Sequence, residues 1–315
     1  MSKPKIALLF PGQGAQYVGM GEDLVQNYGV ARDVFAAADD ALGFSISQLC
    51  FNGPEDILTR TENAQPAILT VSLACWTVLE QEGGVQPEAV AGLSLGEYAA
   101  LVVAQSFDFS TAVRLVHLRG RFMEEAVPAG EGTMAAVLGL SRQEVEAICE
   151  QASINGVVEP ANYNCPGQVV IAGQVSAVAE AGKMVMAQGG KFKPLKVSGP
   201  FHSSLLRPAG ERLAKVLAQV DIKAPLIPVV ANVTADYVKT GQEVEEFLVR
   251  QVSSPVLWED SMKKLIDDGY NAFIEVGPGK ALSGFLKRID RRMRCFNVED
   301  VSSLEKALAE LKGVS

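Results

Sequence analysis

Histidine is scarce in this sequence and cysteine is never clustered, which limits the chemistry that the chain can support. Only two histidines occur among the 315 residues, and the five cysteines include no C-x-x-C pair. An odd number of widely separated cysteines predicts reduced, structural thiols in a cytoplasmic protein. We therefore expect neither a disulfide framework nor a zinc site.

Long apolar runs and an excess of positive charge are also missing. No segment approaches the roughly 18 apolar residues that a membrane-spanning helix needs. The apolar stretch Ile6–Phe10 is too short for the core of a signal peptide. Lys and Arg number 28 against 37 Asp and Glu, which gives a formal net charge of -9. Because nucleic-acid binding requires dense positive charge, we expect no nucleic-acid partner and no membrane partner.

Two glycine-rich turns match nucleotide-binding loops only in part. In the first, Gly12 and Gly14 follow an apolar run, but the third glycine of the dinucleotide-binding fingerprint is missing. In the second, residues 277–280 read Gly-Pro-Gly-Lys, yet Ile274 and Ala281 replace the glycine and hydroxyl residue of a phosphate loop. Both nucleotide-binding interpretations are therefore rejected.

What the sequence does contain is an alternation of predicted strands and helices. Short apolar runs predict buried strands at 5–10, 89–91, 228–232 and 272–276. Helical patterns between them predict a parallel sheet covered on both faces. Between 128 and 199 the order becomes βαββαβ, which is typical of a ferredoxin-like unit. We expect a discontinuous large α/β domain, 1–127 and 200–315, and an inserted small subdomain, 128–199.

The strongest single signal is the spacing Gly92-x-Ser94-x-Gly96 between a predicted strand and a predicted helix. A serine at such a sharp turn has its hydroxyl exposed at the edge of the sheet, and the glycines allow close backbone approach. The next helix points free N–H groups at the same place, and the N–H of Leu95 can help to bind an oxyanion. Chance occurrence in a glycine-rich chain is the alternative.

A nucleophilic serine needs a base, and two histidines are available. His117 lies on the charged face of a predicted helix at 110–126, where a solvated side chain is expected. His202 follows a predicted strand in a turn, where functional sites are commonly built. It is the candidate base, with an ordinary loop histidine as the alternative. The chain order, serine before histidine, matches that of α/β-hydrolases.

Arg119 interrupts the apolar stripe of the helix predicted at 110–126. A guanidinium on a buried stripe is costly unless an anion pairs with it. One interpretation is a structural salt bridge to a carboxylate of the chain. The other is a bidentate clamp on a substrate carboxylate, for which arginine is better suited than lysine.

With these residues placed, the chain resembles the malonyl-CoA:acyl carrier protein transacylase family of fatty-acid synthesis. Polyketide-synthase acyltransferase domains are relatives of that family. The resemblance covers nearly the whole chain and rests on six motifs in order, at 10–16, 92–97, 118–121, 162–168, 199–203 and 275–280. It implies an α/β-hydrolase-like large domain. It also implies transfer of malonyl from malonyl-CoA to the phosphopantetheine thiol of acyl carrier protein, with coenzyme A as a substrate and no cofactor or metal.

The resemblance further implies a role for each matching residue. Ser94 is the acylated nucleophile and His202 its base. The backbone N–H groups of Gln13 and Leu95 form the oxyanion hole. The backbone carbonyl of Gln251 orients the histidine, in place of the usual acid.

Three side chains are assigned to the acyl group by the same resemblance. Arg119 binds the malonyl carboxylate, Asn162 lies near the substrate gorge, and Phe201 matches the version associated with malonyl selection. Some members of the family carry histidine where Leu93 stands, so that side chain is given no role.

Acyl carrier protein is normally acidic, and this chain is acidic too, so docking requires a local basic surface. The candidate is a group of basic residues that only Asp290 opposes: Lys280, Lys287, Arg288, Arg291, Arg292 and Arg294. A solvated helix face is an equally good interpretation of this cluster.

Three other functions remain open from the sequence. A serine thioesterase or hydrolase would use Ser94 and His202 with water as the acceptor. A non-catalytic subunit that binds carrier protein would keep the site as a relic. A free-standing acyltransferase serving a polyketide synthase would share the same chemistry. The sequence separates neither the fatty-acid from the polyketide pathway nor one oligomeric state from another.

Overall fold

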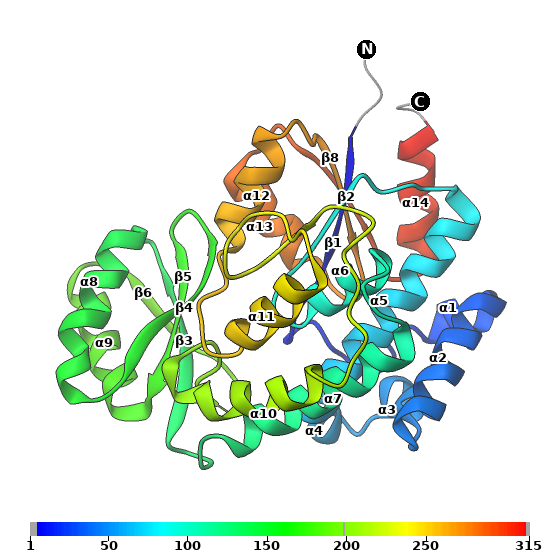
Figure 1. Cartoon of the computed structure of the whole chain (residues 1–315). Coiled ribbons are helices and arrows are strands. Elements are labelled where there is room, and N and C mark those ends of the chain that lie inside the picture. Colours follow the sequence, from blue (N-terminus) through cyan, green and yellow to red (C-terminus); the bar gives the residue numbers. More distant parts are fainter. Residues whose placement is uncertain (1–4, 198, 313–315) are drawn as a thin grey trace.

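The computed structural model describes residues 5–197 and 199–312, which build two α/β units side by side (Figure 1). The larger unit contains a five-stranded parallel sheet and the smaller a four-stranded antiparallel sheet. The second sheet lies within the predicted insertion, so the expected fold class is confirmed. The domain limits at 127/128 and 199/200 stay predictions.

The parallel sheet has the order β7-β2-β1-β8-β9. Its central strand β1 is apolar and alternates between two cores: Leu8 and Phe10 point into one, and Ala7 and Leu9 into the other. A strand buried on both faces is what the continuous apolar runs predicted. The strands are β1 (Ile6–Phe10), β2 (Ala89–Gly92), β7 (Val229–Val230), β8 (Ala272–Val276) and β9 (Arg294–Val298).

Helices cover both faces of this sheet. The long helix α5 is buried along most of its length and packs on α7, which carries Arg119. The helices of the large unit are α1 (Glu22–Asn27), α2 (Gly29–Leu42), α3 (Ile46–Asn52), α4 (Glu55–Leu58), α5 (Thr61–Gly83), α6 (Gly96–Val103), α7 (Phe109–Glu125), α10 (Arg207–Leu217), α11 (Gly241–Gln251), α12 (Trp258–Asp267), α13 (Ala281–Ile289) and α14 (Val301–Lys312).

The smaller unit has the sheet order β4-β5-β3-β6 and the predicted element order βαββαβ. Helices α8 and α9 cover one face of its sheet, over residues such as Val137 and Ile171. The other face turns Met134 and Val170 toward the large unit. The elements are β3 (Gly132–Leu138), α8 (Arg142–Ala152), β4 (Val158–Cys165), β5 (Gln168–Gln174), α9 (Val175–Ala187) and β6 (Lys191–Pro194).

Helix α8 begins at a reciprocal capping box formed by Ser141 and Glu144. Helices α1 and α2 are divided at Tyr28, whose backbone is extended. The sequence analysis missed strand β9, which is only partly buried and so lacks a continuous apolar run. Within the described ranges, no helix is both long and apolar enough to span a membrane.

The two glycines around Ser94 are required by close contacts between neighbouring segments. A Cβ on Gly92 would overlap the backbone of Gly96, and a Cβ on Gly96 would overlap the carbonyl of Phe10. The loop at the end of β2 is further fixed by the Leu93 N–H, which donates to the Phe10 carbonyl over 3.0 Å. The turns that follow β1 and β2 are therefore pressed together.

This contact predicts that Gly96→Ala lowers the free energy of unfolding by about 3 kcal/mol, because backbone must move to admit the methyl group. Chemical denaturation measures the change. Gly284→Ala in α13 is the control, since nothing lies within 4 Å of its added Cβ. It should raise stability by up to about 1 kcal/mol through helix propensity. Equal effects of the two substitutions would contradict the close-contact argument.

Candidate active site

Ser94 lies between the end of β2 and the start of α6, with a left-handed backbone at φ 54°. A non-glycine residue holds this conformation only when its surroundings enforce it. Here Asn232 enforces it: its Oδ1 accepts from the Ser94 N–H over 2.6 Å, and its Nδ2 donates to the Gly92 carbonyl over 2.7 Å. Asn232 is buried just after β7, and the sequence analysis missed it.

His202 is brought beside this serine, as predicted. Its Nε2 lies 2.8 Å from Ser94 Oγ, and its Nδ1 lies 2.8 Å from the backbone carbonyl of Gln251. A carbonyl only accepts, so Nδ1 carries the proton and Nε2 is left to accept from the serine hydroxyl. His202 is 4% exposed. Burial and the positive charge of Arg119 lower the pKa of His202 to about 4, against the opposing effect of its hydrogen bonds.

His117 was expected to be solvated, and that expectation was wrong. Its side chain is half-buried, its Nδ1 lies 2.9 Å from the carbonyl of Glu62, and its ring packs against Phe44. It ties α7 to α5. Because it is engaged there, it does not compete with His202 as the base.

Arg119 is 1% exposed and its guanidinium reaches the serine. Nη2 donates to Ser94 Oγ over 3.1 Å and to Gln251 Oε1 over 2.9 Å, while Nη1 donates to Gln65 Oε1 over 2.7 Å. Among the described residues, no carboxylate forms an ion pair with Arg119, and its buried Nε has no partner. The geometry does not support the structural salt bridge, and it leaves hydrogen-bonding capacity for an anionic ligand.

A cavity of about 430 Å³ opens over this serine, between the two units. The large unit contributes Gln13, Leu95 and Phe201 to its wall, and the small sheet contributes Asn162 and Val170. Two larger surface grooves, of about 740 and 760 Å³, contain neither histidine among their described lining residues, so the chemistry belongs to the smaller cavity.

The predicted oxyanion-binding groups meet at this cavity. Gln13 follows β1 and Leu95 precedes α6, and both residues line the wall. Within residues 5–197 and 199–312, neither backbone N–H donates to another group. Two free N–H groups beside a nucleophile are what a developing oxyanion requires.

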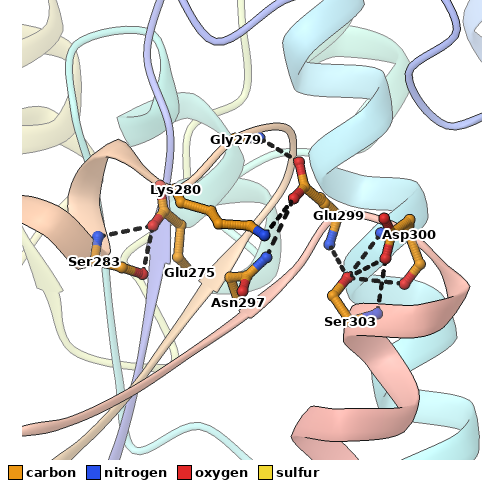
Figure 2. Close-up of polar contacts among 8 residues, drawn as sticks. All are labelled: Glu275, Gly279, Lys280, Ser283, Asn297, Glu299, Asp300 and Ser303. Atoms are coloured by element: carbon orange, nitrogen blue, oxygen red, sulfur yellow. Dashed lines mark hydrogen bonds and ion pairs between the residues drawn. The ribbon is translucent and has the colours of Figure 1, made fainter.

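The Gly-Pro-Gly-Lys turn after β8 forms another part of the wall, through Gly279 and Lys280. Glu299 holds this turn: its carboxylate accepts from the Gly279 N–H over 2.9 Å and pairs with Lys280 over 3.3 Å (Figure 2). Glu275 caps the start of α13 by accepting from Ser283 (Figure 2). The turn is thus built into the cavity wall by neighbouring carboxylates.

No group of three or more His, Cys, Asp or Glu side chains is placed to hold a metal ion in the described part of the chain.

The site contains two further buried groups that the sequence analysis missed. Glu97, in the first turn of α6, accepts from the side chain of Gln251 over 2.8 Å, and Gln65 of α5 accepts from Arg119. Glu97 and Gln65 are polar residues on buried helix faces, and that position is the signal that could have revealed them.

The lowered pKa of His202 predicts how Ser94 reactivity varies with pH. The base form persists below its usual range, so the rate of Ser94 labelling by a fluorophosphonate should stay level between about pH 5 and 8. It should reach half its maximum near pH 4. Ser94→Ala gives the background rate. The profile is repeated in Glu97→Gln because Glu97 itself has a pKa raised to about 7 by burial. Half-maximal labelling near 6.5 in both proteins would contradict a depressed pKa.

Comparisons with known proteins agree with this geometry. The acyl transferase domain family matches residues 7–304. The malonyl CoA-acyl carrier protein transacylase of Bacillus subtilis is 46% identical over 312 residues, covering 98% of each chain. That of Escherichia coli K12 is 44% identical over 305 residues, covering 96% of this chain and 99% of the relative.

Solved structures give the same result. The crystal structure of the malonyl CoA-acyl carrier protein transacylase from Clostridium perfringens has a TM-score of 0.95 at 44% identity, with 98% of both chains covered. A malonyl-transacylase solved in complex with a type II polyketide-synthase acyl carrier protein has a TM-score of 0.95 at 41% identity, covering 97% of this chain and 99% of that one. The present chain is therefore a member of the malonyl CoA-acyl carrier protein transacylase family of acyltransferases.

Proposed function

We propose that this enzyme transfers malonyl from malonyl-CoA to the phosphopantetheine thiol of acyl carrier protein in fatty-acid biosynthesis, through a malonyl-Ser94 intermediate. The observation that carries the proposal is one hydroxyl with two partners. Ser94 Oγ lies 2.8 Å from the His202 imidazole and 3.1 Å from the Arg119 guanidinium. A nucleophile and its base thus share a buried cavity with an unpaired cation, as transfer of an acidic acyl group requires.

In the first half-reaction, His202 Nε2 takes the hydroxyl proton while Ser94 Oγ attacks the thioester carbonyl. The carbonyl oxygen becomes an oxyanion that accepts from the N–H groups of Gln13 and Leu95; one such donor is typically worth about a hundred- to a thousand-fold in rate. The intermediate then collapses, the carbon–sulfur bond breaks, and the thiol of coenzyme A leaves with the proton from His202. The Gln251 carbonyl stabilises the imidazolium without placing a full negative charge next to it.

In the second half-reaction, the thiol of carrier protein gives its proton to His202, and its sulfur attacks the ester carbon. The bond to Ser94 Oγ breaks, and the proton returns to the serine. Arg119 supports both halves by binding the free carboxylate of the malonyl group, toward which its unpartnered Nε leaves an N–H to donate. Asn162 and Phe201 confine the acyl group within the cavity, where both line the wall.

This mechanism predicts a covalent adduct when the purified protein meets malonyl-CoA alone. Intact-mass measurement should show an increase equal to one malonyl group, and Ser94→Ala should show none. Addition of acyl carrier protein should then move the group to the carrier and restore the original mass. Steady release of free malonate without a carrier would support the hydrolase instead. Absence of both adduct and malonate release would support a relic site.

The basic cluster around α13 is the proposed docking surface for carrier protein, and its members differ in the contacts that they make. Lys280 pairs with Glu299, and Arg292 pairs with Asp290 over 2.6 Å. Arg288 donates to Gln168 Oε1 and to the Pro166 carbonyl, so it joins α13 to the small unit. Among the described residues, three exposed cations of the cluster have no such partner: Lys287, Arg291 and Arg294.

Double charge reversal, Lys287→Glu with Arg291→Glu, should therefore raise the KM for carrier protein about tenfold or more, because like charges then face an acidic partner. The KM for malonyl-CoA should change little. Lys183→Glu with Lys306→Glu is the matched control, since it changes the net charge equally at exposed positions on α9 and α14. The docking assignment is wrong if both double variants raise the carrier KM to the same extent.

A further inference from the structure

A buried carboxylate lies directly beneath the nucleophile. Glu97 is 1% exposed and lies in the first turn of α6, three residues after Ser94. Its Oε2 accepts two hydrogen bonds, from Gln251 Nε2 over 2.8 Å and from the backbone N–H of Asn232 over 3.0 Å. Within the described ranges, no basic group forms an ion pair with Glu97. Burying a carboxylate without an ion-pair partner costs free energy, so the presence of Glu97 at this position requires an explanation.

The contacts of Glu97 fix the direction of one amide. A carboxylate oxygen can only accept, and Oε2 already faces the backbone N–H of Asn232, so the end of the Gln251 amide beside it must be the NH₂ group. The same NH₂ group donates to the Ser94 carbonyl over 3.1 Å. The oxygen end of Gln251 must then point the opposite way, toward Arg119, from which it accepts over 2.9 Å.

That amide oxygen is one of three acceptors around the Arg119 guanidinium. Ser94 Oγ also accepts from Nη2, over 3.1 Å, and Gln65 Oε1 accepts from Nη1 over 2.7 Å. Acceptors on two different nitrogens fix both the position and the plane of the group, with Nε left unpartnered. If the Gln251 amide were reversed, its NH₂ would face the guanidinium, and two donors would repel each other. The orientation of Gln251 is therefore a condition for the orientation of Arg119.

We propose that Glu97 is a positioning residue for acyl selection: acting through the Gln251 side chain, it holds the Arg119 guanidinium in the plane that favours acyl groups ending in a carboxylate. This inference rests on the proposed role of Arg119. It assigns to Glu97 no contact with substrate and no share in proton transfer. Its effect is expected in the discrimination between acyl groups, rather than in the reactivity of Ser94 alone.

The role depends on the acceptor and not on the charge. Burial raises the pKa of Glu97 to about 7, although the bonds from Asn232 and Gln251 and the nearby Arg119 lower it. Both donors use the same oxygen, Oε2, so a proton on Oε1 leaves the two bonds intact. A glutamine at position 97 can likewise present its carbonyl oxygen to both donors. An apolar side chain cannot, and a shorter carboxylate withdraws the oxygen by one methylene group.

The test compares the ratio of kcat/KM for malonyl-CoA to that for acetyl-CoA, measured by single-turnover acylation of Ser94. Glu97→Met should lower this ratio by at least roughly tenfold, the rate equivalent of losing one hydrogen bond to a charged group. Glu97→Asp should lower it as well, although it keeps the charge. Glu97→Gln should keep the ratio within about threefold of the wild-type value, which is less than one such bond.

Asp300→Asn is the control. The Asp300 carboxylate caps the start of α14, where its Oδ1 accepts from the N–H and the hydroxyl of Ser303 (Figure 2). The substitution should lower thermal stability without changing the ratio, because neither Asp300 nor Ser303 lines the cavity or contacts Arg119. If the role of Glu97 were purely structural, its substitution would lower kcat/KM for malonyl-CoA and for acetyl-CoA by the same factor, and the ratio would not change.

Unchanged ratios in both Glu97→Met and Glu97→Asp would overturn the inference, and either variant suffices if the other fails to fold. The inference would also be overturned if Glu97→Gln lowered the ratio as much as Glu97→Met does, since the charge of Glu97 and not its acceptor oxygen would then matter. Arg119→Ala separates this failure from failure of the proposed function. If Arg119→Ala lowers the ratio while the Glu97 variants do not, only the positioning role is lost. If Arg119→Ala also leaves the ratio unchanged, the clamp itself is wrong.

Discussion

The left-handed backbone at Ser94 is the constraint on which the rest of the site depends. The turn places the hydroxyl at the open edge of the parallel sheet, but it needs glycine on either side and an external hold on the peptide groups. Asn232 supplies that hold from the end of a neighbouring strand. Because the same residue also donates its N–H to Glu97, the backbone strain and the buried polar network are stabilised together.

Gln251 connects the two chemical tasks of the cavity. Its backbone carbonyl sets the tautomer of His202, whereas its side chain contacts Arg119 and Glu97. A neutral carbonyl behind the histidine is consistent with a substrate that brings its own negative charge into the cavity. Arg119 can balance that charge, and the partner of His202 Nδ1 is a carbonyl and not a carboxylate that would oppose it.

The sequence predicted the parts of this arrangement that depend on local pattern. Ser94 was identified by glycine spacing between a strand and a helix, and His202 by the scarcity of histidine. The alternating elements gave the parallel sheet and the inserted βαββαβ unit. Family resemblance supplied Gln251, which no local pattern marks.

Asn232, Glu97 and Gln65 were missed because their partners lie far away in the chain, and the role of a buried polar side chain is evident only when the tertiary contacts are known. The hydrogen bonds of Arg288 to the small unit could not be read from the sequence for the same reason, and its part in docking stays a prediction.

The cavity takes its two sides from different units. In the described part of the chain, the hydrogen bonds that hold Ser94, His202 and Arg119 come from the large unit, whereas the small sheet contributes wall residues such as Met134, Ala136 and Val170. Substitutions on that face of the sheet can therefore enlarge or narrow the space for an acyl chain without disturbing the reacting atoms. In an evolutionary sense, an insertion of this kind makes substrate range and chemistry separately adjustable within one polypeptide.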